Sequence, residues 1–212
     1  MKRFNLVSDW VRKGETFDHW MWSDETSVQL GGNVDYVTVS NKHDPRRLVG
    51  VQNFPRKIMA WGVITSDGPG PLVILNKGET MKSVNYLEII QKYLVPFVDH
   101  SYGRTKAIFQ QDFASCHYSA EAMDKFAEWS ITIAPWAPVC PDLSPIEYIW
   151  REMKLWVHTV ASPTTRPELE DACTYWWSNH LTKEMIRKYI SHIQSNTQKV
   201  RNNMGGPIVD RW

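Results

Sequence analysis

The feature that most limits the possible folds is the order of strand-like and helix-like segments along the chain. Short runs rich in Val, Ile, Trp and Thr come first, and Gly or Pro residues end them in turns. Helical apolar periods then alternate with single strands, and helices finish the chain. This order predicts an α/β domain with a mixed sheet, whose first three strands are antiparallel and whose two faces carry helices. The expected strands are 19–30, 34–40, 58–65, 71–75, 106–112 and 130–136, and the expected helices are 83–95, 119–129, 145–157, 166–181 and 182–203.

Length and composition are those of one globular domain. The chain has 212 residues, of which 42% are hydrophobic and 22% charged, enough to bury a core. Its formal net charge of +1 neither requires nor excludes nucleic acid, so any basic surface is local. Three scattered cysteines form no zinc or disulfide motif and suit a reducing compartment. No apolar run reaches the ~18 residues that cross a bilayer, so no membrane partner is expected. The polar start predicts a lead-in helix rather than a secretory signal.

Three acids occupy positions where α/β proteins place chemistry. Asp24 lies within the first predicted strand, Asp112 ends a later strand, and Glu147 lies in the first turn of a helix. Three clustered carboxylates repel one another unless a divalent cation neutralises them, and Mg²⁺ prefers such oxygen ligands. Glu25 should point away from the site, because side chains alternate along a strand. Spacing alone is weak support, since a chain with 23 acids offers many triples.

Four ordered motifs make the acidic hypothesis specific. The stretches "WSDETSVQL", "IMAWGVIT", "QQDFASCH" and "APWAPVCPDLSPIEYIW" occur in that order, and 34 residues (113–146) separate Asp112 from Glu147. They resemble the catalytic domain of the Tc/mariner transposases of the DDE superfamily, with their SDE strand, V-W-G strand, Q-Q-D-N-x-x-x-H motif and W-P-x-x-S-P-D-L-N-P-I-E-x-x-W motif. The resemblance covers residues 18–156 and includes the spacing of the second and third acids.

The resemblance implies a fold, a reaction and a location. The fold is RNase H-like with a mixed five-stranded sheet. The reaction cuts DNA at transposon ends and joins the freed 3′ hydroxyl to target DNA, in a nucleus and by a homodimer. Asp24, Asp112 and Glu147 match the three metal-binding acids, which implies two Mg²⁺ ions bridged by Asp24, with Mn²⁺ as a substitute. Residues 1–17 are expected to be a lead-in remnant, and residues 18–212 the catalytic domain without the family's helix-turn-helix domains.

Some residues near the acids have two interpretations. Ser144 at the N-cap, followed by Pro145, makes Glu147 a candidate for a capping box as well as for a metal ligand. His117 matches the histidine of the Q-Q-D motif and could contact an acid or substrate, or only make a structural hydrogen bond. Asp142 is expected to be a turn acid and not a ligand. Trp61, Trp136 and Trp150 match family aromatics and are expected in the core.

Basic residues are candidates for DNA contact, although charged runs are more often solvated faces. Lys183, Arg187 and Lys188 have the helical spacing of one basic face and are the favoured set. Arg46 and Arg47 form a second candidate pair in a predicted loop, and Arg56, Lys57, Lys199 and Arg201 are weaker candidates.

One departure from the family pattern keeps other functions open. Phe113 stands where the family has Asn, directly after Asp112, and it cannot make the polar contacts of an amide. An inactive or host-adopted domain that binds DNA or protein is therefore one alternative. A nuclease of RNase H type that cuts RNA–DNA hybrids is another, since the same three acids would serve it.

Overall fold

The computed structural model describes residues 2–31 and 57–208. The predicted strand 34–40, most of the loop after it, and Arg46, Arg47 and Arg56 lie outside the described residues. Helices and strands follow in the order α1 (Lys2–Lys13), β1 (Trp20–Gln29), β2 (Lys57–Thr65), β3 (Gly68–Ile74), α2 (Ser83–Ile89), η2 (Ile90–Leu94), α3 (Val95–Ser101), β4 (Ile108–Gln110), α4 (Ala120–Glu128), β5 (Thr132–Ile133), η3 (Pro141–Leu143), α5 (Pro145–Trp156), η4 (Val157–Ala161), α6 (Arg166–Asn179) and α7 (Lys183–Asn202).

One sheet of five strands organises the described part of the chain. Its strand order is β3-β2-β1-β4-β5. β1, β2 and β3 pair antiparallel, whereas β4 pairs parallel to β1 and β5 pairs parallel to β4. The predicted mixed sheet with an antiparallel first half is confirmed. Parallel pairing requires crossover connections, and α2, α3 and α4 provide them.

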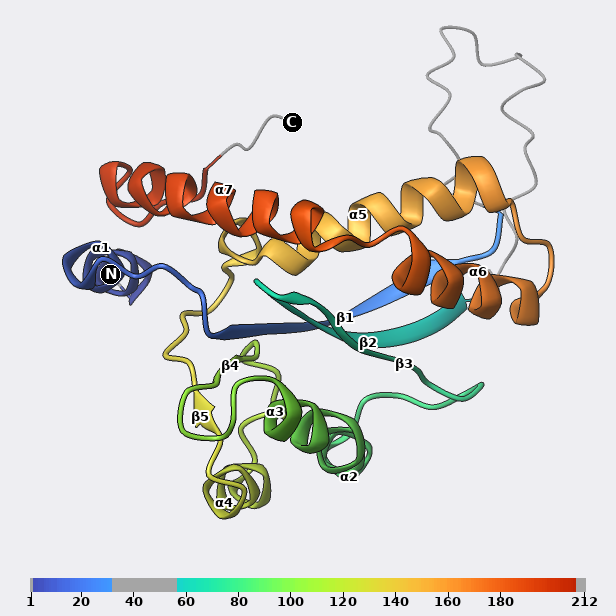
Figure 1. Cartoon of the computed structure of the whole chain (residues 1–212), viewed down its shortest axis with the longest axis horizontal. Coiled ribbons are helices and arrows are strands. Elements are labelled where there is room, and N and C mark those ends of the chain that lie inside the picture. The colour runs from blue at the N-terminus through green and yellow to red at the C-terminus, as the bar shows by residue number, and fades with distance from the viewer. Residues whose placement is uncertain (1, 32–56, 209–212) are drawn as a thin grey trace, which may run out of the picture.

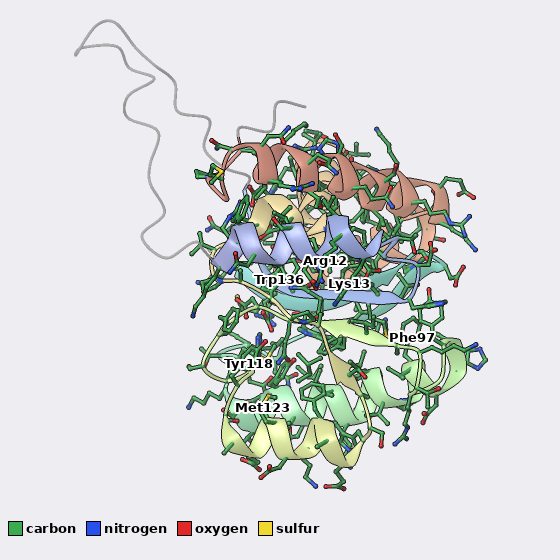
Figure 2. All side chains as sticks on the ribbon, turned by 90° about the vertical axis from the view of Figure 1, so that its left-hand side faces the viewer. Arg12, Lys13, Phe97, Tyr118, Met123 and Trp136 are labelled. Atoms are coloured by element: carbon green, nitrogen blue, oxygen red, sulfur yellow. The ribbon has the colours of Figure 1, made fainter. Side chains whose placement is uncertain are left out.

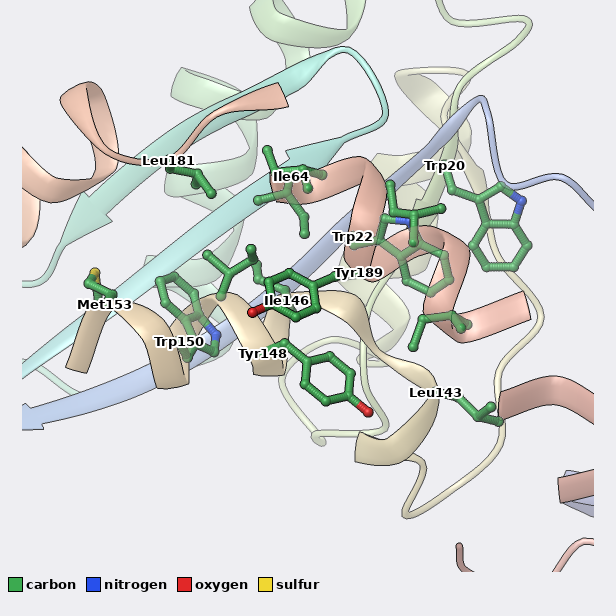
Figure 3. Packing of buried hydrophobic residues seen from close by; sticks show 14 of the residues in the cluster. Trp20, Trp22, Ile64, Leu143, Ile146, Tyr148, Trp150, Met153, Leu181 and Tyr189 are labelled. Carbon is green, nitrogen blue, oxygen red and sulfur yellow. The ribbon is translucent and has the colours of Figure 1, made fainter. Parts of the chain in front are cut away.

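Helices cover both faces of the sheet, and each face has its own core (Figure 1). Alternation along β1 divides its side chains: Trp20 and Trp22 join the cluster under α1, α5, α6 and α7, and Met21 joins the cluster under α2, α3 and α4. Figure 3 shows the first cluster, in which Trp150 of α5 lies against the sheet. Trp61 and Trp150 are fully buried, as predicted. Trp136 is partly buried against the first cluster.

Helix α1 is part of this first core. Leu6, Val7 and Trp10 are buried in it, and α1 contacts α7. The helix itself was predicted, but its three buried residues show that it contributes apolar surface to the domain. The proposed division at residue 18 stays a prediction.

The sequence predicts a helix over 83–95 that stops before Pro96, and this predicted end is wrong. The helix continues through the π-helical turn η2 into α3, and Pro96 lies in the first turn of α3. A π turn changes the backbone hydrogen-bond pattern just before the proline, so the missing N–H and the ring are tolerated there. Among the helices in residues 2–31 and 57–208, none combines the length and apolar character needed to cross a membrane.

Candidate active site

Strand pairing brings the first two acids to the same region of the sheet. β1 and β4 run parallel with Trp22 opposite Gln110, and the Ser23 hydroxyl donates to the Gln110 carbonyl at 2.7 Å. Two residues further along each strand are Asp24 and Asp112. The sequence therefore places both acids at the carboxyl end of β4, where the sheet opens beyond the strand end.

Asp24 lies in a low-dielectric pocket against α5. The indole N–H of Trp150 donates to Asp24 Oδ2 at 3.2 Å. Burial, followed by the charges of Glu147, Glu25 and Asp112, raises the pKa of Asp24 to about 8. Burial and the neighbouring acids disfavour the charged form of Asp24, and a bound cation would favour it.

The position of Trp150 depends on a glycine in β2. Gly62 is opposite Asp24 in the β1–β2 register, and a Cβ atom at Gly62 would come within 2.7 Å of Trp150 Cη2 and 2.9 Å of Trp177 Cη2. The two indoles stack with centroids 5.2 Å apart. Gly62 thus lets both rings cross the strand closely enough for Trp150 to reach Asp24.

Glu147 is on the first turn of α5, and its capping interpretation is not supported. Ser144 is the N-cap, but α5 has no side-chain cap hydrogen bond. The Ser144 N–H already donates to the Pro141 carbonyl at 3.1 Å, so it does not need the Glu147 carboxylate. Glu147 is exposed as a whole residue, but desolvation of its carboxyl group raises the pKa of that group.

His117 links the second acid to Glu25. Its Nδ1 lies 2.7 Å from Asp112 Oδ1, and its Nε2 lies 3.2 Å from Glu25 Oε1. Burial opposes a charged imidazole, but these two ion pairs outweigh it and raise the pKa of His117 to about 10. The same contact lowers the pKa of Asp112. The imidazolium therefore pairs with both Asp112 and Glu25, balances one of their two negative charges, and fixes the orientation of both.

The expectation that Glu25 would be remote from the site is wrong. Alternation holds, since Asp24 faces α5 and Glu25 faces His117, but Asp112 lies past the end of β4, where groups from both faces can reach it. Ligand atoms of Glu25, Asp112 and His117 all lie within 4.8 Å of one another. Glu25 and the Trp150 indole N–H are the groups that the sequence did not assign to the site. The adjacency of Glu25 to Asp24 was the available signal.

The favoured basic face on α7 is occupied by contacts within the domain. Lys183 Nζ lies 2.8 Å from Asp67 Oδ1, and Arg187 Nε donates to the Ser66 carbonyl at 2.8 Å. Lys188 lies over the Tyr189 ring, 5.6 Å from its centroid. These contacts attach α7 to the β2–β3 turn. A role of the same residues in DNA contact stays a prediction.

The five-stranded sheet, with Asp24 and Asp112 at the carboxyl end of β4, defines an RNase H-like domain. The family model of the DDE superfamily endonucleases matches residues 19–170. The chain belongs to this family.

Curated relatives agree with this assignment. The Tc1 transposase of Caenorhabditis elegans is 29% identical over 139 residues, which are 63% of this chain and 50% of the relative. The Tcb1 transposase of Caenorhabditis briggsae is 24% identical, covering 76% of this chain and 60% of the relative. The chain therefore spans about half the length of these relatives. The resemblance to Tc/mariner transposases is confirmed.

Solved structures support the fold. The catalytic domain of Mos1 mariner transposase matches with a TM-score of 0.76 at 17% identity, covering 98% of this chain and 94% of that one. A pre-cleavage Mos1 transpososome matches with a TM-score of 0.79 at 17% identity, covering 98% of this chain and 63% of that one. The predicted RNase H-like architecture is confirmed.

Proposed function

We propose that this chain is the catalytic core of a Tc/mariner-type transposase, which cuts DNA strands and joins a freed 3′ hydroxyl to target DNA. The observation that carries the proposal is the placement of Asp24 and Asp112 at the carboxyl end of β4 in a chain of the DDE family. Burial raises the pKa of Asp24, and the charges of Glu147, Glu25 and Asp112 add to this rise, so a bound cation would favour the ionised form of Asp24.

The residues fit a divalent metal. Asp24, Asp112 and Glu147 offer the carboxylate oxygens that Mg²⁺ prefers, and Mos1 catalytic-domain structures with Mg and with Mn share this fold. We propose that Asp24, Asp112 and Glu147 would together hold two such ions. When bound, such a pair activates an attacking oxygen and stabilises the leaving oxygen of a phosphodiester.

The chain's own residues orient these ligands. The Trp150 N–H holds one oxygen of Asp24 at 3.2 Å and leaves its other oxygen to the site. His117 restrains Asp112, whose side chain is 52% exposed and therefore accessible to substrate. The rigid start of α5 fixes Glu147. Ligands held by strands and helices keep the geometry that phosphoryl transfer needs.

Nicking of supercoiled plasmid in Mn²⁺ tests the proposal. The chain should convert supercoiled to open-circular DNA, and Asp112→Asn should abolish this. Asp99→Asn is the matched control, because Asp99 is also an exposed aspartate in an ion pair, with Arg104 instead of His117. Nicking that survives Asp112→Asn would contradict the proposed site.

Two alternatives have their own outcomes in the same assay. An RNA–DNA hybrid cut faster than duplex DNA would favour a nuclease of RNase H type. Binding of DNA without any cutting would favour a host-adopted domain, an alternative that Phe113 keeps open.

Partners and location are proposed on the same basis. Mos1 matches include paired-end and strand-transfer complexes, which supports transposon ends and target DNA as partners and a homodimer as the active form. DNA as substrate supports a nuclear location. Arg46, Arg47, Lys183, Arg187 and Lys188 remain the proposed backbone contacts.

A further inference from the structure

An exposed aromatic residue lies directly beside a proposed metal ligand. Phe113 follows Asp112 and is 46% exposed, although phenylalanine is normally buried. Other large apolar side chains of the described residues are also exposed, but Phe113 is the one adjacent to a proposed acid in the chain. Leaving an aromatic ring in water costs free energy unless another molecule covers it.

Phe113 is half of a stacked pair. Its ring is nearly parallel to that of Tyr118, with an interplanar angle of 8° and centroids 4.9 Å apart. Figure 2 shows Tyr118 on the side of the sheet that carries α4. Tyr118 stacks on the Phe113 ring, and Phe113 still stays 46% exposed, so we infer that a third flat ring can stack on the pair.

The loop that carries this pair is held in place. The Gln111 amide donates to the His117 carbonyl at 3.1 Å, and Tyr86 donates its hydroxyl hydrogen to Gln111 Oε1. The Ala114 N–H donates to Asp112 Oδ1 at 2.9 Å. A surface fixed in this way can bind a flat group with little further loss of conformational freedom.

The surroundings select the kind of group that binds. Asp112 and Glu25 share the single positive charge of His117, so this end of the sheet offers no excess positive charge to hold a free phosphate where no cation is bound. A neutral aromatic ring instead offers a stacking face to any nucleobase, irrespective of sequence. Within a duplex, neighbouring base pairs cover both faces of a base, so only an unpaired base can use the ring.

We propose that the Phe113–Tyr118 pair is a stacking platform for one unpaired base next to the DNA phosphate held at Asp112. This proposal rests on the proposed function for its substrate, DNA, but not on cleavage. Phe113 stands where the family has Asn, and this replacement gives the chain a base-binding surface at that position.

Fluorescence of 2-aminopurine tests the platform. The probe is a DNA duplex with one unpaired 2-aminopurine nucleotide in a short 3′ overhang, titrated with the whole chain in Ca²⁺ so that cutting is suppressed. The wild-type chain and Phe113→Trp should quench the probe, since both stack on it. Phe113→Asn should abolish quenching and weaken binding to this probe about 5- to 100-fold, while leaving affinity for a fully paired duplex unchanged.

Tyr175→Asn is the matched control. Tyr175 is also exposed, at 55%, and stacks on Trp156, but it lies on α6 away from the acids. It should leave both quenching and affinity unchanged. Equal quenching and equal affinity for wild type and Phe113→Asn would overturn the proposal. A change in oligomeric state in Phe113→Asn without any effect on DNA would also overturn it and would identify a protein interface.

Plasmid nicking, measured in parallel, separates this proposal from the proposed function. Quenching without nicking supports the platform and contradicts the transposase activity. Nicking by a wild-type chain that does not quench the probe contradicts the platform alone, and the absence of both contradicts both.

Discussion

At the scale of single residues, one hydrogen bond gives the buried Trp150 a role at the site as well as in the core. Trp150→Phe keeps the ring in the core but removes the N–H that holds Asp24 Oδ2. Losing a partner of a metal ligand costs roughly 10- to 100-fold in metal affinity, so Mn²⁺ binding measured by calorimetry should weaken by that amount.

Trp177→Phe is its control. Trp177, which stacks on Trp150, donates its own N–H to the Gly70 carbonyl at 2.9 Å instead of to an acid. It should therefore leave Mn²⁺ affinity unchanged. Equal affinities for the two variants would show that the Trp150 N–H does not position Asp24.

The raised pKa of Asp24 predicts a pH-dependent loss of stability in the metal-free protein. With its pKa raised to about 8, folded Asp24 keeps its proton between about pH 4 and pH 8, where the unfolded chain releases it. The free energy of unfolding therefore falls as pH rises through this window. Asp24→Asn removes this dependence and should be more stable than wild type by at least about 1 kcal/mol at pH 8.

Urea unfolding in EDTA at pH 4, 6 and 8 measures the difference. The advantage of Asp24→Asn should grow with pH and should vanish when saturating Mn²⁺ stabilises the wild type alone. Asp99→Asn, which removes an exposed carboxylate whose pKa is lowered by its contact with Arg104, should show no advantage that grows with pH. A constant difference between wild type and Asp24→Asn across the three pH values would mean that Asp24 is not desolvated.

At the scale of elements, β2 meets α5 and α6 through Gly62. Gly62→Ala forces both the Trp150 and Trp177 rings to move, because the new methyl group lies under 3 Å from each. Overpacking of this kind costs about 1–3 kcal/mol, measurable by urea unfolding. Trp177→Leu opens space beside the methyl, so the double variant should lose less than the two single losses added. Losses in the free energy of unfolding that simply add would mean that the two indole rings move aside without strain.

Element-scale patterns were largely predictable, and the exceptions have physical causes. The helix expected over 119–129 forms as α4, and the Ser119 hydroxyl caps it by accepting from the Ala122 N–H. The helix predicted over 83–95 does not end before Pro96, because the π turn η2 accommodates the proline. The Ser144–Glu147 pattern matches a capping box, as Thr165 and Glu168 do in α6, where the box forms. At α5 the Ser144 N–H already donates to the Pro141 carbonyl of the preceding η3 turn, and no sequence pattern predicts this bond.

At the scale of the whole molecule, contacts between distant segments were beyond the sequence. Asp24, Asp112 and Glu147 could be proposed as site acids because each lies in a recognisable local motif, and their role as metal ligands stays a prediction. The Glu25–His117 ion pair was not foreseen, because it depends on where β4 ends relative to β1. Likewise, Asp142 was expected to be only a turn acid, yet it accepts both guanidinium N–H groups of Arg3 at 2.8 and 2.7 Å.

Asp142 joins four parts of the chain. Arg3 comes from α1, the Asn196 side chain of α7 donates to the Asp142 carbonyl at 3.0 Å, and the Ile208 N–H approaches Asp142 Oδ2 at 3.4 Å. Both charged side chains are nearly buried, 14% exposed for Arg3 and 12% for Asp142. Asp142→Ala leaves a desolvated guanidinium without its carboxylate, which should cost about 3–5 kcal/mol in the free energy of unfolding.

A second ion pair provides the matched comparison for this cost. Arg104 and Asp99 also form a bidentate pair, at 2.6 and 2.8 Å, but their side chains are 37% and 47% exposed. Asp99→Ala should therefore cost far less in the free energy of unfolding than Asp142→Ala, because water screens an exposed ion pair. Arg3→Met combined with Asp142→Leu should recover most of the loss of Asp142→Ala, because an apolar pair leaves no buried charge. Equal costs for Asp142→Ala and Asp99→Ala in urea unfolding would show that α1 is held to the domain by its apolar residues alone.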